Sequence, residues 1–163
     1  MTKEANLSIP LTYVPLRNSF FIVLAAAYLE SEILQRIEKD QVKPENIDAR
    51  IFIAANSLDY AGYPDCRPEY YRKINSLLKL ASKVSTQYNV QIKVEAPLLK
   101  KTKKDIAEMG LKLNAPLELT WSCYLGAEVP CGKCDACQLR ARGFKEAGKE
   151  DPLITRLKKE GKL

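Results

Sequence analysis

Four of the five cysteines of this chain lie in one short segment near its C-terminal end, and their spacing constrains the fold more than any other feature. The spacing is C-x7-C-x2-C-x2-C, formed by Cys123, Cys131, Cys134 and Cys137. Four thiolates at such spacings are typical of a closed tetrahedral zinc site, which has no open position for a substrate. Gly132 suits the tight turn that lets two sulfur atoms face one ion. The pattern therefore predicts a structural Zn²⁺ ion held by these cysteines.

Other uses of clustered thiols stay open at this point. A C-x2-C-x2-C run also occurs in ferredoxins, but there a fourth cysteine follows three residues later and precedes a proline. Residues 138–141 supply neither. A redox dithiol needs only two cysteines, so a third at the same spacing argues against it. Cys66 stands apart, and we expect a small loop or buried residue there rather than a nucleophile, because the chain has no histidine to activate a thiol.

Charge and hydropathy narrow the classes of protein further. The formal net charge is +6, concentrated in the lysine runs LLKKTKKD and RLKKEGKL. Such runs suit an anionic partner, although a solvated surface explains either run alone. No stretch has the roughly 20 apolar residues of a membrane span, and the first residues do not form a secretory signal, so a cytoplasmic protein with reduced thiols is expected. With no histidine, a general base must be a carboxylate, a lysine or a tyrosine.

Strand-like and helix-like segments alternate along the first two thirds of the chain. The predicted elements are strand 11–14, helix 18–38, strand 49–55, helix 68–88, strand 90–97, and a helix capped by Thr102 and Asp105 and closed by Gly110. This order implies an α/β fold with a parallel sheet, helices on both faces and right-handed crossovers, plus a four-cysteine zinc-binding appendage. Three short strands are few for such a sheet, so the chain resembles part of a larger one.

The sequence predicts three parts. Residues 1–116 form the partial nucleotide or substrate domain, 117–148 the zinc-binding module, and 149–163 a charged tail. In open parallel sheets, ligands bind outside the carboxyl ends of the strands. The loops 14–18 and 55–68 occupy that position and are rich in polar residues.

Three segments together resemble one family. They are TYVPLRNSFF, DYAGYPDCRPEY and TWSCYLG with CGKCDACQLRARGF, and they match the C-terminal two thirds of the 7-cyano-7-deazaguanine synthases of queuosine biosynthesis. The match runs from about Ile9 to Pro152 in the family's order. The resemblance implies a Rossmann-like sheet of the adenine nucleotide alpha hydrolase type. It also implies conversion of 7-carboxy-7-deazaguanine, ammonia and ATP, with Mg²⁺, into the nitrile through an adenylated carboxylate and an amide.

The resemblance also implies a set of substrate- or nucleotide-binding residues. They are Arg17, Asn18, Asn56, Asp59, Tyr60, Asp65, Arg67 and Lys103. Several of them have a simpler explanation. Asn18 would be a good helix N-cap, Asp65 and Arg67 could form a salt-bridged turn, and Lys103 lies in a lysine-rich stretch typical of solvated surface.

The family's glycine-rich ATP loop, SGGxDS, has no counterpart in this sequence, in which no two glycines are adjacent. The resemblance therefore implies an incomplete synthase: its ATP-binding half could be a separate polypeptide docked on the open sheet edge, the chain could be a truncated piece, or the remnant could have been repurposed. A homo-oligomer is a further way to complete the site. The alternative function is a non-catalytic, zinc-stabilised module that binds nucleic acid or a protein partner. An ATP-pyrophosphatase relative acting on another base also stays open.

Overall fold

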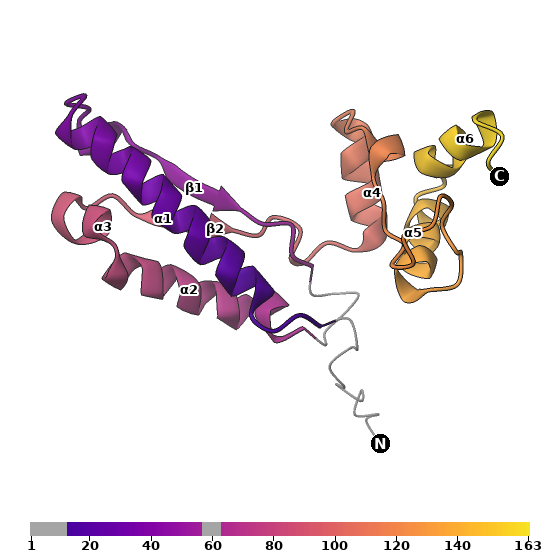
Figure 1. The fold of residues 1–163 in the computed structure, drawn as a ribbon, viewed down its shortest axis with the longest axis horizontal. Coiled ribbons are helices and arrows are strands. Elements are labelled where there is room, and N and C mark those ends of the chain that lie inside the picture. Colours follow the sequence, from indigo (N-terminus) through magenta and orange to yellow (C-terminus); the bar gives the residue numbers. More distant parts are fainter. Residues whose placement is uncertain (1–12, 57–62) are drawn as a thin grey trace, which may run out of the picture. The chain divides into compact units, whose positions relative to one another are not determined.

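The structure is a computed structural model that describes residues 13–56 and 63–163 (Figure 1). Its helices are α1 Arg17–Glu38, α2 Pro68–Ala81, α3 Lys83–Tyr88, α4 Lys103–Lys112, α5 Asp135–Glu146 and α6 Pro152–Lys159. The strands are β1 Ala49–Phe52 and β2 Ile92–Glu95, and short 3₁₀ turns η1, η2 and η3 span Pro44–Asn46, Pro64–Cys66 and Leu117–Leu119. The chain divides into two compact units, residues 1–100 and 101–163, which we describe separately. The boundaries expected at 116/117 and 148/149 stay a prediction.

The first unit contains a small parallel sheet, which confirms the predicted α/β class. β1 pairs with β2 in parallel, with Ala49 opposite Ile92 and Phe52 opposite Glu95. Burial alternates along both strands: Ala49 and Ile92 are buried, whereas Phe52 is 64% exposed. Within the described residues, the helices therefore cover one face of the sheet, and the other face is open. Of the expected strand 11–14, residues 13 and 14 are irregular, and 11 and 12 lie outside the described residues.

The core of this unit lies between α1, α2 and the covered face of the sheet. α1 contacts both strands and buries Ile22 and Ala26, while α2 packs mainly on β2. The predicted single helix 68–88 is wrong, because Ser82 has an extended backbone and separates α2 from α3. Its hydroxyl accepts the backbone N–H of Ser85 at 3.3 Å, so the chain restarts a helix with a side-chain cap instead of continuing the first one.

Asn75 of α2 satisfies the outward-facing backbone groups of Val94 in β2. Its Oδ1 accepts the backbone N–H of Val94 at 2.8 Å, and its Nδ2 donates to the Val94 carbonyl oxygen at 3.0 Å. Both groups of Val94 point away from β1, so the amide takes the place of a neighbouring strand. β1 has no such cover among the described residues, and its second edge is open.

The second unit packs α4 against α5, and η3 against α6. The predicted capping pair is confirmed: Thr102 and Asp105 form a reciprocal capping box. The predicted stop at Gly110 is wrong, because α4 continues to Lys112 and the left-handed residue after it is Asn114. Gly110 instead gives room to the Leu117 side chain, which would lie 3.1 Å from an added Cβ. Within the described ranges, no helix is long and apolar enough to cross a membrane.

Candidate functional site

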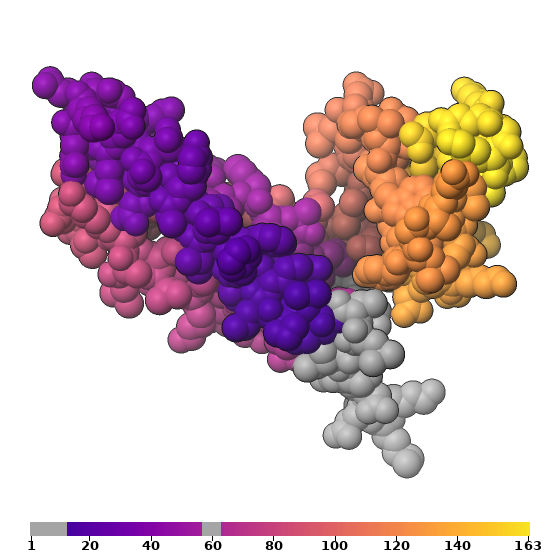
Figure 2. All heavy atoms as spheres, viewed as in Figure 1, coloured from indigo at the N-terminus to yellow at the C-terminus, as the bar shows by residue number. Residues whose placement is uncertain are grey.

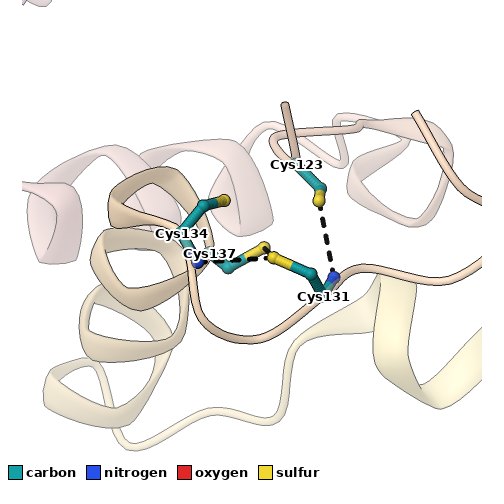
Figure 3. Close-up of side chains that lie close together, drawn as sticks. All are labelled: Cys123, Cys131, Cys134 and Cys137. Atoms are coloured by element: carbon teal, nitrogen blue, oxygen red, sulfur yellow. Dashed lines mark hydrogen bonds between the residues drawn. The ribbon is translucent and has the colours of Figure 1, made fainter. Parts of the chain in front are cut away.

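The four clustered cysteines converge in the second unit (Figure 3). Cys123 follows η3 in an irregular segment, Cys131 lies in the next loop, Cys134 is the N-cap of α5, and Cys137 lies in its first turn. Two loop residues thus meet two residues at the start of one helix. All four are free thiols.

Their sulfur atoms are spaced as a tetrahedral metal site requires. The four Sγ atoms lie within 4.8 Å of one another, and the Sγ atoms of Cys131 and Cys137 are 4.0 Å apart. A tetrahedron with metal–sulfur bonds of about 2.3 Å has sulfurs separated by roughly 3.8 Å. The cluster is therefore able to bind a metal ion after only small side-chain adjustments.

Backbone amides point at these sulfurs and favour their ionised form. The N–H groups of Lys133 and Cys134 both donate to Cys131 Sγ, at 3.4 and 3.3 Å, across the turn that Gly132 makes with φ +68°. Amides of Tyr124 and Cys137 lower the pKa of Cys134 to about 6, whereas burial raises the pKa of Cys137 to about 12. A metal ion must displace the Cys137 proton, and its positive charge supplies the stabilisation that the buried thiolate lacks.

Arg140 of α5 holds the loop around the cluster to the C-terminal helix. Its guanidinium forms a two-pronged pair with Asp151, with Nε–Oδ2 and Nη2–Oδ1 distances of 2.6 and 2.8 Å. It also donates to Thr120 Oγ1 at 2.8 Å and to the Leu117 carbonyl oxygen at 3.2 Å. Asp151 in turn accepts the backbone N–H of Leu153 and caps α6. Nothing in the sequence spacing indicated this pair, which joins three segments.

In the first unit, the predicted site motifs around Asn18 and Asp65 are in direct contact. The backbone N–H of Asn18 donates to Asp65 Oδ2 at 3.3 Å. The Asn18 side-chain amide donates to the Asp65 carbonyl oxygen at 3.4 Å and to Cys66 Sγ at 3.7 Å. All three residues are buried. Two segments that lie far apart in the sequence are thus joined beyond the carboxyl end of β1.

The contact corrects the expected role of Asn18 as an N-cap. α1 begins at Arg17, its N-cap position is Leu16, and the first turn receives its acceptor from Asp65 instead. A carboxylate at a helix N-terminus is favoured by the helix dipole. Because Asp65 accepts the N–H of Asn18, the first turn of α1 is not free to bind a phosphate. No ion pair joins Asp65 to Arg67 within the described part of the chain.

Other polar groups surround this contact. Asn56, just beyond β1, donates from Nδ2 to the Leu98 carbonyl oxygen at 2.9 Å, which ties the ends of the two strands together. Ser19 and Tyr70 share a hydrogen bond of 2.8 Å between their hydroxyls. Burial and the neighbouring Asp65 raise the pKa of Cys66, so its thiol is protonated at neutral pH. This agrees with a buried residue rather than a nucleophile.

The remaining predicted residues lie elsewhere. Arg17 and Arg67 are exposed beside the contact, at the starts of α1 and α2. Asp59 and Tyr60 lie outside the described residues. Lys103 begins α4 in the second unit. The structure thus brings Asn18, Asn56 and Asp65 to one end of the first unit.

Comparison with known proteins gives one consistent family. Residues 1–148 match the sequence model of "Queuosine biosynthesis protein QueC". A 7-cyano-7-deazaguanine synthase of Thermoplasma volcanium is 49% identical over 145 residues, covering 89% of this chain and 54% of the relative. Synthases of the same name from Picrophilus torridus and Nostoc punctiforme are 46% and 40% identical over 151 residues, each covering 93% of this chain and 56% and 61% of the relative. The chain thus spans somewhat more than half the length of these relatives.

Proposed function

Because this chain belongs to the queuosine biosynthesis protein QueC family, we propose that it forms part of an ATP-dependent ligase that makes 7-cyano-7-deazaguanine from 7-carboxy-7-deazaguanine and ammonia. The observation that carries the proposal is the identity of 40–49% to synthases of this name across most of the chain. The ATP loop and Mg²⁺ site belong, in this proposal, to polypeptide that the present chain does not contain.

The chemistry explains why such an enzyme needs ATP. A carboxylate is a poor electrophile. When its oxygen attacks the α-phosphorus of ATP, pyrophosphate is released and the carboxylate becomes a mixed anhydride with AMP, which is a good leaving group. Ammonia then displaces AMP and gives the amide. A second adenylation, on the amide oxygen, lets AMP leave with that oxygen while two protons are lost and the nitrile forms. The site must therefore hold a purine-like base close to anionic phosphates.

The residues at the end of the first unit suit the substrate part of this task. Asn18 and Asp65 fix the start of α1 against the turn before α2, and Asn56 fixes the strand ends. We assign these contacts a positioning role. The exposed cations Arg17 and Arg67, one on each side, are the groups we assign to the substrate carboxylate or the phosphates, since guanidinium forms two-pronged bonds to such anions.

We further propose that the four-cysteine cluster holds Zn²⁺ in a structural role. An all-sulfur donor set of four thiolates fits zinc and fills its tetrahedral coordination, so no position remains for substrate. When bound, the ion would add to the small hydrophobic core of this unit by cross-linking two loops to α5.

The test is nitrile formation, followed by mass spectrometry, from 7-carboxy-7-deazaguanine, ammonium, ATP and Mg²⁺. We expect product when this chain is mixed with the part of the Thermoplasma volcanium synthase that lies outside the match. No product in the mixture, together with salt-sensitive RNA binding by the chain, would refute the ligase and favour the non-catalytic alternative. Product from the chain alone would refute the assignment of ATP binding to other polypeptide.

A further inference from the structure

Helix α1 is apolar on its outer side as well as on the side that packs in the core. The outer side carries Phe20, Phe21, Val23, Leu24 and Tyr28, which we call the α1 outer face. Their exposed fractions run from 49% for Val23 to 69% for Tyr28. Figure 2 shows the first turns of α1, in indigo, uncovered in the first unit. Contiguous exposed apolar residues of this size mark an interaction surface in soluble proteins.

The second half of the same helix is built differently. Its exposed positions carry Ser31, Glu32, Gln35 and Arg36, a normal water-facing side. By contrast, no charged residue occurs between Asn18 and Glu30. The apolar outer side is therefore confined to the first half of the helix, which is the half that begins at the contact between Asn18 and Asp65. A partner bound there would lie next to the residues we assign to substrate positioning.

The sheet beneath α1 also lacks neighbours in the described residues. It has two parallel strands with one covered face, whereas parallel sheets are normally buried on both faces. On the outer edge of β2, Asn75 occupies both backbone groups of Val94, so β1 is the more open edge for a further strand. The helix layer thus has an uncovered apolar side on α1, and the sheet layer has an open edge at β1. At these places both layers of the first unit lack neighbours among the described residues.

The length of the relatives indicates what covers this surface. The Thermoplasma volcanium synthase matches 89% of this chain, yet the match covers only 54% of that relative. Nearly half of the relative therefore lies outside the match, and this part is available to cover a unit equivalent to this one. We propose that the α1 outer face binds that remaining part of the synthase, carried either by a separate polypeptide or by a longer form of this chain. This inference rests on the proposed function, because it identifies the surface that completes the enzyme.

The test measures association directly, with the unmatched part of the Thermoplasma volcanium synthase as the probe and sedimentation velocity as the assay. The test variant is Leu24→Lys with Tyr28→Lys, two exposed positions of the outer face. The matched control is Ser31→Lys with Gln35→Lys, which adds the same two charges on the water-facing side of the same helix. Circular dichroism of each variant checks that the helices are retained.

We expect the wild-type chain and the control to bind the probe alike, and the test variant to bind at least about tenfold more weakly, because two ammonium groups must lose water in an apolar interface. Equal binding by the test variant would overturn the inference. So would no binding by the wild-type chain, or self-association of the wild type through this face that the probe does not displace. The association assay does not depend on turnover, so the two proposals can fail separately. Binding without nitrile synthesis would refute the proposed ligase alone. Nitrile synthesis together with unchanged affinity of the test variant would refute only the assignment of the α1 outer face as the binding surface.

Discussion

Replacing Asp151 tests how the C-terminal helix supports the cysteine cluster. The Arg140 and Asp151 side chains are only 13% and 10% exposed, and their two contacts are 2.6 and 2.8 Å long. Removing one partner of a buried ion pair costs about 3–5 kcal/mol. When Asp151 is replaced, Arg140 keeps its hydrogen bonds to Thr120 and Leu117, so we expect the free energy of unfolding to fall by less than this. Asp151→Asn keeps an N-cap acceptor and should destabilise the second unit by roughly 2 kcal/mol. Asp151→Ala should lose about 1 kcal/mol more, since the cap of α6 also disappears.

Urea unfolding followed by tryptophan fluorescence measures this loss. Trp121 is the chain's single tryptophan, and its Nε1 donates to the Cys123 carbonyl oxygen at 3.0 Å, so its emission reports on the loop that carries the cluster. The control is Lys158→Ala, which removes an ion pair to Glu150 whose partners are 58% and 60% exposed. That pair should contribute less than about 1 kcal/mol. A loss below about 0.5 kcal/mol for Asp151→Asn, on the scale of the control, would refute the reasoning.

Further predictions concern the metal, one close helix contact and one thiol. Removing the metal with a chelator should release one equivalent of zinc and change Trp121 emission while the first unit keeps its helical signal; visible iron absorbance would contradict this. Gly143→Ala should destabilise the α4–α5 pair by about 1–2 kcal/mol in the same urea assay, because overpacking against the Lys103 backbone, 3.0 Å from the new Cβ, outweighs the gain in helix propensity. A rise in stability would contradict it. Because the pKa of Cys66 is raised, its alkylation by iodoacetamide at pH 8 should be slower than that of a small-molecule thiol and should accelerate at higher pH. Mass spectrometry of the zinc-loaded protein measures this rate, and alkylation of Cys66 as fast as that of the small thiol at pH 8 would contradict the prediction.

Features that depend on nearby residues could be predicted from the sequence. The capping box of Thr102 and Asp105 needs only three residues, and the cysteine cluster needs only its spacing. Features set by distant contacts could not. Gly110 has the appearance of a helix end, but its role is to admit Leu117, which only the folded unit reveals.

In the candidate site, too, some features follow from the sequence motifs and others depend on distant contacts. The motifs indicated that Asn18 and Asp65 belong to one site, but not that Asp65 would supply the first turn of α1 with its acceptor across 47 positions of sequence. Likewise, the pair of Arg140 and Asp151 has no local pattern, because it depends on how α6 folds back onto η3. Burial and partner choice are properties of tertiary packing, which spacing alone does not encode.

The Asn75 amide makes the two edges of the sheet unequal, and this limits how the chain can aggregate. Unpaired strand edges are templates on which identical chains add without end. Here the β2 edge already carries a side chain on both hydrogen-bonding groups of Val94, whereas β1 has no such cover among the described residues and is the more open template. If two copies joined through β1, the resulting sheet would have a β2 strand at each end, where Asn75 occupies the hydrogen-bonding groups of Val94 and hinders further growth. Asn75 therefore makes β2 the less favourable of the two edges for mispairing between copies of this chain.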